Sequence, residues 1–258
     1  LGQLDEDIKA TPAGYKTGYE ALDNKITIPQ GAITLIAGRP GHGKTALLMN
    51  LCLNMAQAYP DRSFVFFSYE LNCRQIGLRM LSILADQVID PARPEHNLAN
   101  LARYIREDRG DLEAVERARS RFSNLTNDKL EGGRLILVDE PFTVEDLSYA
   151  LDLIAGAYDP LGAIFVDYMQ KVKVKDQPRE QKYVQIQKAS AGILEAAHRL
   201  NVPVIAGAQF GRAKGQERKV TLDNLRESGD LEQDANLVLG LYDPVQGEKD
   251  GDNVEGLD

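Results

Sequence analysis

Residues 38–45, Gly-Arg-Pro-Gly-His-Gly-Lys-Thr, constrain this chain more than any other segment, because they match the phosphate-binding pattern G-x-x-x-x-G-K-[ST] in full. A short β-branched stretch at 32–37 precedes the pattern, and a helix-forming stretch begins at Ala46. This order predicts a buried strand, a loop and a helix whose positive dipole end faces a phosphate. A glycine-rich turn that binds nothing is the alternative, but the flanking strand and helix favour nucleotide binding.

The loop predicts both a triphosphate and a metal ion. Lys44 is expected to neutralise charge on the β- and γ-phosphates, and the Thr45 hydroxyl is expected to ligate Mg²⁺. The expected cofactors are therefore ATP, or another nucleoside triphosphate, and Mg²⁺. On this interpretation the nucleotide-binding residues are Gly38, Arg39, Pro40, Gly41, His42, Gly43, Lys44, Thr45 and Ala46.

The composition argues against several classes of protein. The 258 residues carry a net charge of −9, which does not suit a protein that coats nucleic acid without specificity. The charge is uneven, because residues 171–219 hold 11 Lys or Arg against four Asp or Glu, as either a solvated face or a track for a polyanion would. Two cysteines without paired spacing, and no apolar run of membrane-spanning length, predict a soluble cytoplasmic protein with no membrane partner.

Apolar strands alternate with amphipathic helices, which is typical of an α/β fold with a mainly parallel, doubly wound sheet flanked by helices. We expect one domain at 19–242, a lead-in segment at 1–18 and a mobile acidic tail at 243–258. Residues 88–131 are polar and are expected to elaborate the core. The predicted strands after 32–37 are 63–69, 134–138, 162–166, 202–208 and 237–242.

Acidic residues follow three of the predicted strands, at the position where open α/β sheets bind their ligands. Glu70 follows 63–69 and is a candidate general base, although it could instead be an acidic cap that opens the next helix. Asp139 with Glu140, and separately Asp167, follow apolar strands as a metal-binding carboxylate of an ATPase does. The first pair carries its own base, whereas Asp167 would need Glu70, and spacing does not decide between the two schemes.

The motifs, taken in order, resemble the C-terminal motor domain of the DnaB-type replicative helicases over about residues 17–242. Besides the phosphate-binding loop they are Ser68-x-Glu70, Val166-Asp167-Tyr168-x-Gln170, Val202-Pro203-Val204-Ile205-x-x-x-Gln209-x-x-Arg212 and Leu225-Arg226-Glu227-Ser228-Gly229-x-x-Glu232-Gln233-Asp234-Ala235. The last block discriminates best, because phosphate-binding loops occur in many families. The resemblance implies a RecA-like P-loop NTPase fold and a hexameric ring that hydrolyses nucleoside triphosphates while it moves 5′ to 3′ along single-stranded DNA.

The resemblance also assigns roles to individual residues. Glu70 would activate the attacking water, Asp167 would support the metal and Gln209 would sense the γ-phosphate. The catalytic residues are then Glu70, Lys44 and Gln209, and Asp139 becomes a structural residue at a strand end. The expected contacts to the DNA backbone are Arg226, Glu227, Gly229, Arg212 and Lys214.

The chain departs from the family pattern in places. Gly41-His42 stands where the family commonly has Ser-Met. Ala208 and Gly211 replace a commoner Ser and Asn. No Lys-x-Arg strand that would reach the neighbour's nucleotide follows Tyr242, so we expect a fragment or a shortened relative that is weakly active as an isolated chain. Primase or a helicase loader would bind through regions outside this sequence.

Two other functions remain open from the sequence. A RecA-like ATPase of the recombination or clock type shares the core, but it does not usually have the block at 225–235. A nucleotide-gated assembly module would open a ring or dock a partner without unwinding DNA. Replacing Glu70 with Gln separates the classes, because a motor loses hydrolysis whereas a gating module keeps its partner.

Overall fold

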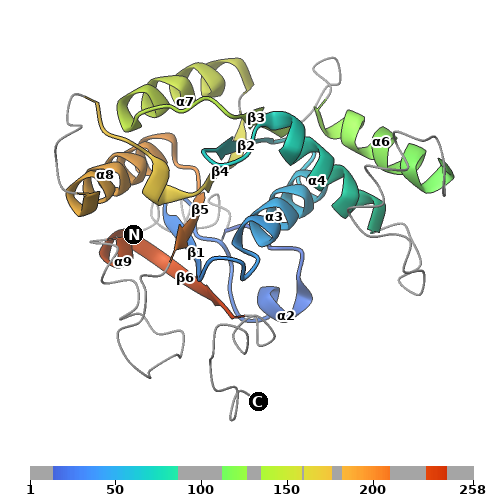
Figure 1. The fold of residues 1–258 in the computed structure, drawn as a ribbon, viewed down its shortest axis with the longest axis horizontal. Coiled ribbons are helices and arrows are strands. Elements are labelled where there is room, and N and C mark those ends of the chain that lie inside the picture. Colours follow the sequence, from blue (N-terminus) through green and yellow to red (C-terminus); the bar gives the residue numbers. More distant parts are fainter. Residues whose placement is uncertain are drawn as a thin grey trace, which may run out of the picture.

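The computed structural model describes residues 14–86, 112–126, 135–158, 160–175, 182–209 and 231–242. Its centre is a 6-stranded sheet in the order β3-β2-β4-β5-β1-β6, in which every neighbouring pair of strands is parallel (Figure 1). The strands are β1 (Ile33–Gly38), β2 (Ser63–Ser68), β3 (Leu135–Val138), β4 (Leu161–Asp167), β5 (Val204–Gln209) and β6 (Ala235–Leu241). The predicted parallel α/β architecture is therefore confirmed.

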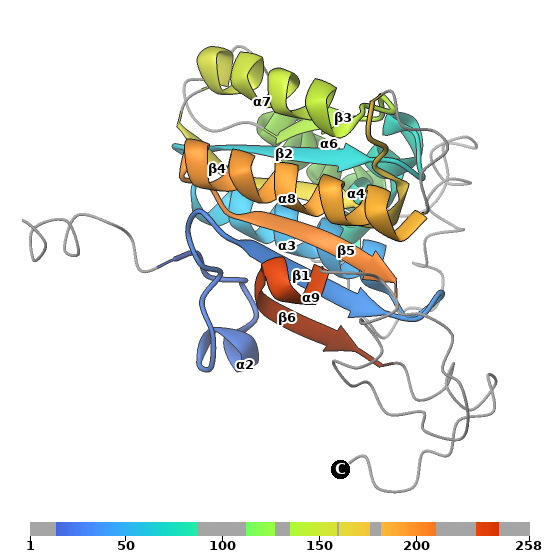
Figure 2. The same cartoon turned by 90° about the vertical axis from the view of Figure 1, so that its left-hand side faces the viewer.

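Helices cover both faces of the sheet, as Figures 1 and 2 show from two directions. One layer contains α3 (Lys44–Ala58), α4 (Cys73–Asp86) and α6 (Leu112–Thr126). The other layer contains α7 (Val144–Tyr158) and α8 (Lys182–Leu200). The short helical segments are α2 (Glu20–Asp23), the 3₁₀ turn η2 (Met169–Lys171) and α9 (Leu231–Asp234).

The core lies on both faces of the sheet because its central strands are apolar throughout. In β2, Phe64 and Phe66 pack with the α3 layer, whereas Val65 and Phe67 pack with the α7 and α8 layer. This division follows from the alternation of side chains along a strand. A glycine in β4 makes room for the packing, since a Cβ at Gly162 would lie 2.5 Å from the Phe64 ring.

The strand order places the carboxyl ends of four strands around one position. β4 and β5 lie between β1 and β2, although β1 and β2 are consecutive in the chain. The connection after β1 passes through α3 in one helix layer, whereas the connection after β4 passes through α8 in the other layer. Open α/β sheets bind ligands outside the carboxyl ends of their strands, where the strand order reverses.

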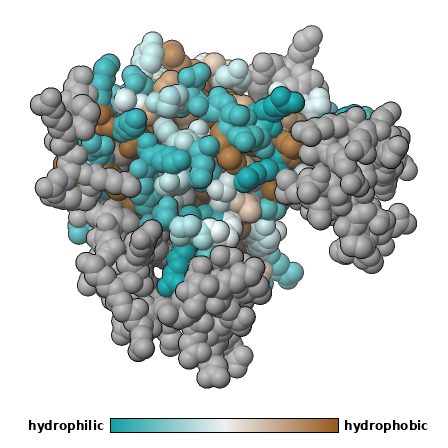
Figure 3. Space-filling model, in the orientation of Figure 1, coloured by the Kyte–Doolittle hydropathy of each residue, from teal (hydrophilic) through white to brown (hydrophobic). Residues whose placement is uncertain are grey.

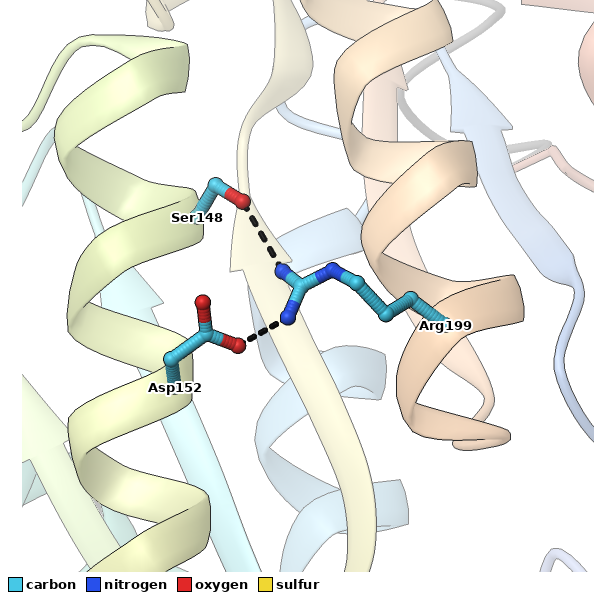
Figure 4. Close-up of polar contacts among 3 residues, drawn as sticks. All are labelled: Ser148, Asp152 and Arg199. Carbon is cyan, nitrogen blue, oxygen red and sulfur yellow. Dashed lines mark hydrogen bonds and ion pairs between the residues drawn. The ribbon is translucent and has the colours of Figure 1, made fainter.

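The two outer helices α7 and α8 are held together at close range. The Arg199 guanidinium on α8 donates to the Asp152 carboxylate and, at 2.9 Å, to Ser148 Oγ on α7 (Figure 4). Elsewhere on this contact, a Cβ at Gly192 would lie 2.6 Å from Val144 Cγ2. Glycine therefore allows the close approach of α8 to the beginning of α7.

The described end of the lead-in segment packs against the domain. Tyr15 and Ile28 exchange two backbone hydrogen bonds of 2.9 Å, and Tyr15 and Thr17 are buried. The Thr17 carbonyl accepts a bond from Asn54 Nδ2 at 3.1 Å, and the Tyr59 hydroxyl accepts one from the Lys16 N–H at 3.1 Å. Residues 14–18 are thereby attached to the C-terminal end of α3. The acidic tail at 243–258 lies outside the described residues, as does most of 88–131.

The described surface in Figure 3 is mostly hydrophilic, and its hydrophobic areas are small and separate. Within the described residues, the exposed large hydrophobic side chains are Tyr19, Tyr149 and Leu153. None of the helices in this part of the chain combines the length and hydropathy that a membrane-spanning helix needs.

Candidate nucleotide-binding site

A cavity of about 350 Å³ opens at the carboxyl ends of β1, β2, β4 and β5. From the phosphate-binding loop its lining takes Pro40, Gly41, Gly43, Lys44, Thr45 and Ala46. From the other strand ends and α4 it takes Glu70, Leu71, Arg79, Asp167, Tyr168 and Gln209. The residues to which the family resemblance assigns a catalytic or metal-binding role therefore all line this one cavity: Lys44, Thr45, Glu70, Asp167 and Gln209.

Two glycines give the phosphate-binding loop its shape. The backbone φ is 83° at Gly41 and 84° at Gly43, in the left-handed region that favours glycine. No described atom lies within 4 Å of the position that a Cβ would take at Gly43, so its conformation rather than lack of space requires glycine. Helix α3 begins directly after it at Lys44. The first N–H groups of a helix have no partner inside the helix and are available to an anion.

Lys44 is held at the loop by two backbone carbonyls. Its Nζ donates to the Gly38 carbonyl at 2.9 Å and to the Arg39 carbonyl at 2.7 Å. Burial lowers the pKa of the ammonium group, and the nearby carboxylates of Asp167 and Glu70 oppose this shift. A bound phosphate would add further negative charge beside this partly buried ammonium group.

Asp167 is the buried carboxylate of the site. Burial raises its pKa, the Thr45 hydroxyl and the charge of Lys44 lower it, and the Glu70 carboxylate raises it further. Its Oδ2 atom is buried and has no hydrogen-bond partner within the described part of the chain. Gly207 on the adjacent strand leaves room for Leu48 and Tyr168, since a Cβ there would lie 3.1 Å from Leu48 Cδ1 and 3.3 Å from Tyr168 Cβ.

These donors fit Mg²⁺. Mg²⁺ in ATPases is usually bound by one or two protein oxygens together with waters and substrate phosphates. The unpartnered Asp167 Oδ2 and the Thr45 hydroxyl are oxygens of that kind at the edge of the cavity. The described residues contain no cluster of three or more His, Cys, Asp or Glu that would indicate an all-protein metal site.

Glu70 enters the cavity because the chain turns sharply after β2. The Leu71 N–H donates to Ser68 Oγ at 3.0 Å, which closes a turn around Glu70. The Tyr69 N–H donates to the Asp167 carbonyl at 2.8 Å and so ties the end of β2 to the end of β4. Glu70 itself is solvent-exposed, so a water molecule can reach its carboxylate.

Arg79 is a cavity residue that the sequence reasoning missed. It comes from the second turn of α4, and its positive charge lowers the pKa of Asp167. A basic residue on a helix face is not by itself a signal, because most such residues are solvated. Its helix directly follows the Glu70 turn, which is what brings the guanidinium to the cavity.

Asp139 and Glu140 do not line the cavity. They follow β3, which lies at the edge of the sheet beyond β2. Asp139 Oδ2 accepts a hydrogen bond of 2.6 Å from the Cys73 N–H, the first residue of α4. Asp139 therefore satisfies a free N–H at the start of a helix, which is a structural role.

Replacing Asp139 with Ala is expected to lower the free energy of unfolding by about 1 kcal/mol, because one capped N–H of α4 loses its acceptor. Nucleotide affinity should stay at the wild-type level, because the carboxylate lies outside the cavity. Urea denaturation and nucleotide titration measure the two quantities. A variant of unchanged stability with impaired nucleotide binding would contradict the structural role.

Three residues predicted for nucleotide binding do not line the cavity. Gly38 and Arg39 contribute carbonyls to Lys44 instead. His42 is buried, and its ring centre lies 5.7 Å from that of Tyr242, which follows β6. The His42 side chain thus packs between the loop and the edge strand.

The predicted DNA contacts lie outside the described residues. These are Arg212, Lys214, Arg226, Glu227 and Gly229. The described part of the basic stretch includes Lys171, Lys173 and Lys175, which are all exposed.

The sequence matches the family model of the DnaB-like helicase C terminal domain over residues 14–255. It is 28% identical over 235 residues to the replicative DNA helicase DnaB of Helicobacter pylori strain J99, covering 89% of this chain and 44% of the relative. It is 33% identical over 233 residues to the replicative DNA helicase DnaB of Buchnera aphidicola subsp. Acyrthosiphon pisum, covering 89% of this chain and 47% of the relative. The chain thus spans less than half the length of these curated relatives.

Solved structures agree on the fold. The ATPase domain of G40P superposes with a TM-score of 0.78 at 22% identity and covers 99% of this chain and 86% of that one. A DnaB-like replicative helicase, whose structure was described with its interactions with primase, gives a TM-score of 0.76 at 22% identity. It covers 99% of this chain and 59% of that one. The likeness confirms the RecA-like class of P-loop fold.

Proposed function

Because the chain belongs to the DnaB-like helicase C-terminal domain family, we propose that it is the motor domain of a replicative DNA helicase. In this role it hydrolyses ATP in order to move 5′ to 3′ along single-stranded DNA, as part of a ring. The observation that carries the proposal is the shared cavity, in which Lys44, Glu70 and Asp167 meet at the ends of three strands. Family membership favours this function over a recombination-type ATPase or a gating module.

Each cavity residue has a physical role in the proposed reaction. The N–H groups at the start of α3 bind phosphate oxygens, and Lys44 leaves the Gly38 and Arg39 carbonyls to neutralise the β- and γ-phosphates. Thr45 and Asp167 would hold Mg²⁺, which supplies charge neutralisation on the phosphates when bound.

Glu70 acts as the general base. Its exposed carboxylate accepts a proton from the water that attacks the γ-phosphorus, and ADP and phosphate leave. Gln209 lies at the end of β5 and lines the same cavity, where it would contact the γ-phosphate. Its interaction exists with ATP and is lost with ADP, so that the end of β5 reports the state of the nucleotide.

We propose that a neighbouring chain completes the site. A cation supplied by an adjacent subunit stabilises transferred phosphoryl groups in many NTPases. Self-association into a ring, most simply a hexamer, would place such a group at the cavity. Separate chains should then bind ATP but hydrolyse it slowly.

Single-stranded DNA is the proposed partner of the basic stretch. Lys171, Lys173 and Lys175 are exposed around the buried Val172, where the chain leaves the 3₁₀ turn η2. Arg212, Lys214, Arg226, Glu227 and Gly229 are proposed to extend this surface. Primase or a helicase loader is a further proposed partner. The proposed location is the replication fork in the cytoplasm.

Assembly tests this function directly. We expect light scattering of the purified chain to show a larger species only with a non-hydrolysable ATP analogue and Mg²⁺, and the ATPase rate per chain to rise with assembly and with oligo-dT. The reason is that the neighbouring chain completes the site. Fast turnover by a monomer that DNA does not stimulate would contradict the proposal.

A further inference from the structure

The end of β5 lacks a strand partner on one side. β4 and β5 pair from Ile164 with Val204 to Val166 with Ala206, and the pairing ends there. β5 nevertheless continues to Gln209, which pairs with Gly38 of β1 on its other side. On the β4 side the chain has turned away into η2.

The side chain of Gln170 fills the missing position. Its Nε2 donates to the Gln209 carbonyl at 3.1 Å, and its Oε1 accepts the Gln209 N–H at 3.2 Å. A carboxamide carries the same donor and acceptor as a peptide group, so it can replace a strand residue in a ladder. Gln170 is thus bonded to both backbone groups of a single residue, 39 positions along the chain.

Gln170 is itself held firmly. It is the middle residue of η2, which directly follows Tyr168 of the nucleotide cavity. The Val172 N–H donates to the Met169 carbonyl at 3.1 Å and closes this 3₁₀ turn around Gln170. Met169 is fully buried. The amide of Gln170 therefore joins the strand end that carries Asp167 to the strand end that carries Gln209.

We propose that Gln170 is a positioning residue that fixes the backbone of Gln209 and thereby holds its side chain at the γ-phosphate. This inference rests on the proposed function of the cavity. Only glutamine has both the length and the paired donor and acceptor for this contact. Asparagine is one methylene shorter, and a glutamate at this position would set an oxygen against the Gln209 carbonyl.

The test is the preference of the full chain for a triphosphate over a diphosphate. Calorimetric titration in the presence of Mg²⁺ gives the Kd of ADP and the Kd of a non-hydrolysable ATP analogue. The Kd of ADP divided by the Kd of the analogue measures contact with the γ-phosphate. Gln170→Ala and Gln170→Glu should each reduce this ratio roughly 3- to 10-fold, the value of one or two neutral hydrogen bonds. Gln209→Ala should reduce it similarly, and the double variant should show no further loss.

Gln57 offers a matched control. Its side chain donates to the Leu53 carbonyl at 3.0 Å within α3 and is not part of the cavity. Gln57→Ala should leave the ratio unchanged. Amide hydrogen exchange provides a second readout, because the Gln209 N–H should lose protection in Gln170→Ala and keep it in Gln57→Ala.

The possible results distinguish the positioning role of Gln170 from the proposed function of the cavity. A normal ratio in both Gln170 variants, with a reduced ratio in Gln209→Ala, would overturn the positioning role and leave the proposed function standing. A normal ratio in Gln209→Ala would also overturn it, because there would be no contact to position. Failure of the wild-type chain to bind either nucleotide would overturn the proposed function itself.

Discussion

Glu70→Gln is expected to lower kcat for ATP hydrolysis by about 10²- to 10⁴-fold, the usual contribution of a general base. Glutamine has the shape of glutamate but cannot take the proton of the attacking water. The Kd for ATP should stay near the wild-type value, because Lys44 and the start of α3 remain in place. Phosphate release at saturating ATP measures kcat, and titration with a fluorescent analogue measures the Kd.

The chain provides a matched control at Glu140. This carboxylate also follows a parallel strand, but that strand is β3 at the edge of the sheet, and Glu140 does not line the cavity. Glu140→Gln should therefore hydrolyse ATP at the wild-type rate. If the Glu140 variant were inactive and the Glu70 variant active, the general base would have been assigned to the wrong strand.

Lys44→Ala is expected to weaken ATP binding roughly 10- to 100-fold, because charge-assisted hydrogen bonds to an anion contribute about 1.5 to 3 kcal/mol. The two carbonyls that hold Lys44 would remain near the loop and would not attract phosphate. ADP binding should weaken as well, since the ammonium group also serves the β-phosphate. Calorimetric titration of both nucleotides measures the effect.

Lys25→Ala is the control for the loss of one positive charge. Lys25 is exposed and does not line the cavity. ATP affinity should therefore be unchanged in this variant. Thermal unfolding of both variants shows whether any loss of affinity comes from unfolding of the loop. If both substitutions weakened ATP binding equally, the affinity would depend on the net charge of the protein rather than on a direct contact from Lys44.

Much of the fold and most of the cavity could be predicted from the sequence. The phosphate-binding loop is a local pattern, and its neighbours β1 and α3 follow from apolar stretches that are contiguous in the chain. The choice between Asp139 and Asp167 could not be made from spacing, because both follow a strand. Strand order decides it, since β4 lies near β1 and β3 lies at the edge. That order depends on packing between distant segments, and only the family resemblance indicated it.

The contacts that support the site were not predictable. Gln170 reaches Gln209 across 39 positions, and no local pattern marks a side chain that imitates a strand. Arg79 was missed because helical arginines are common on surfaces. The packing of Tyr15 on Ile28 was hidden because isolated bridges leave no periodic signal.

The attachment of residues 14–18 to α3 has a mechanical consequence. Helix α3 has 15 residues and is therefore about 22 Å long. Its first residue, Lys44, binds phosphate in the proposed site. At its other end, Asn54 and Tyr59 form hydrogen bonds with Thr17 and Lys16. Because α3 joins the proposed phosphate site to residues 16 and 17, a tilt of α3 on nucleotide binding would shift these residues as well.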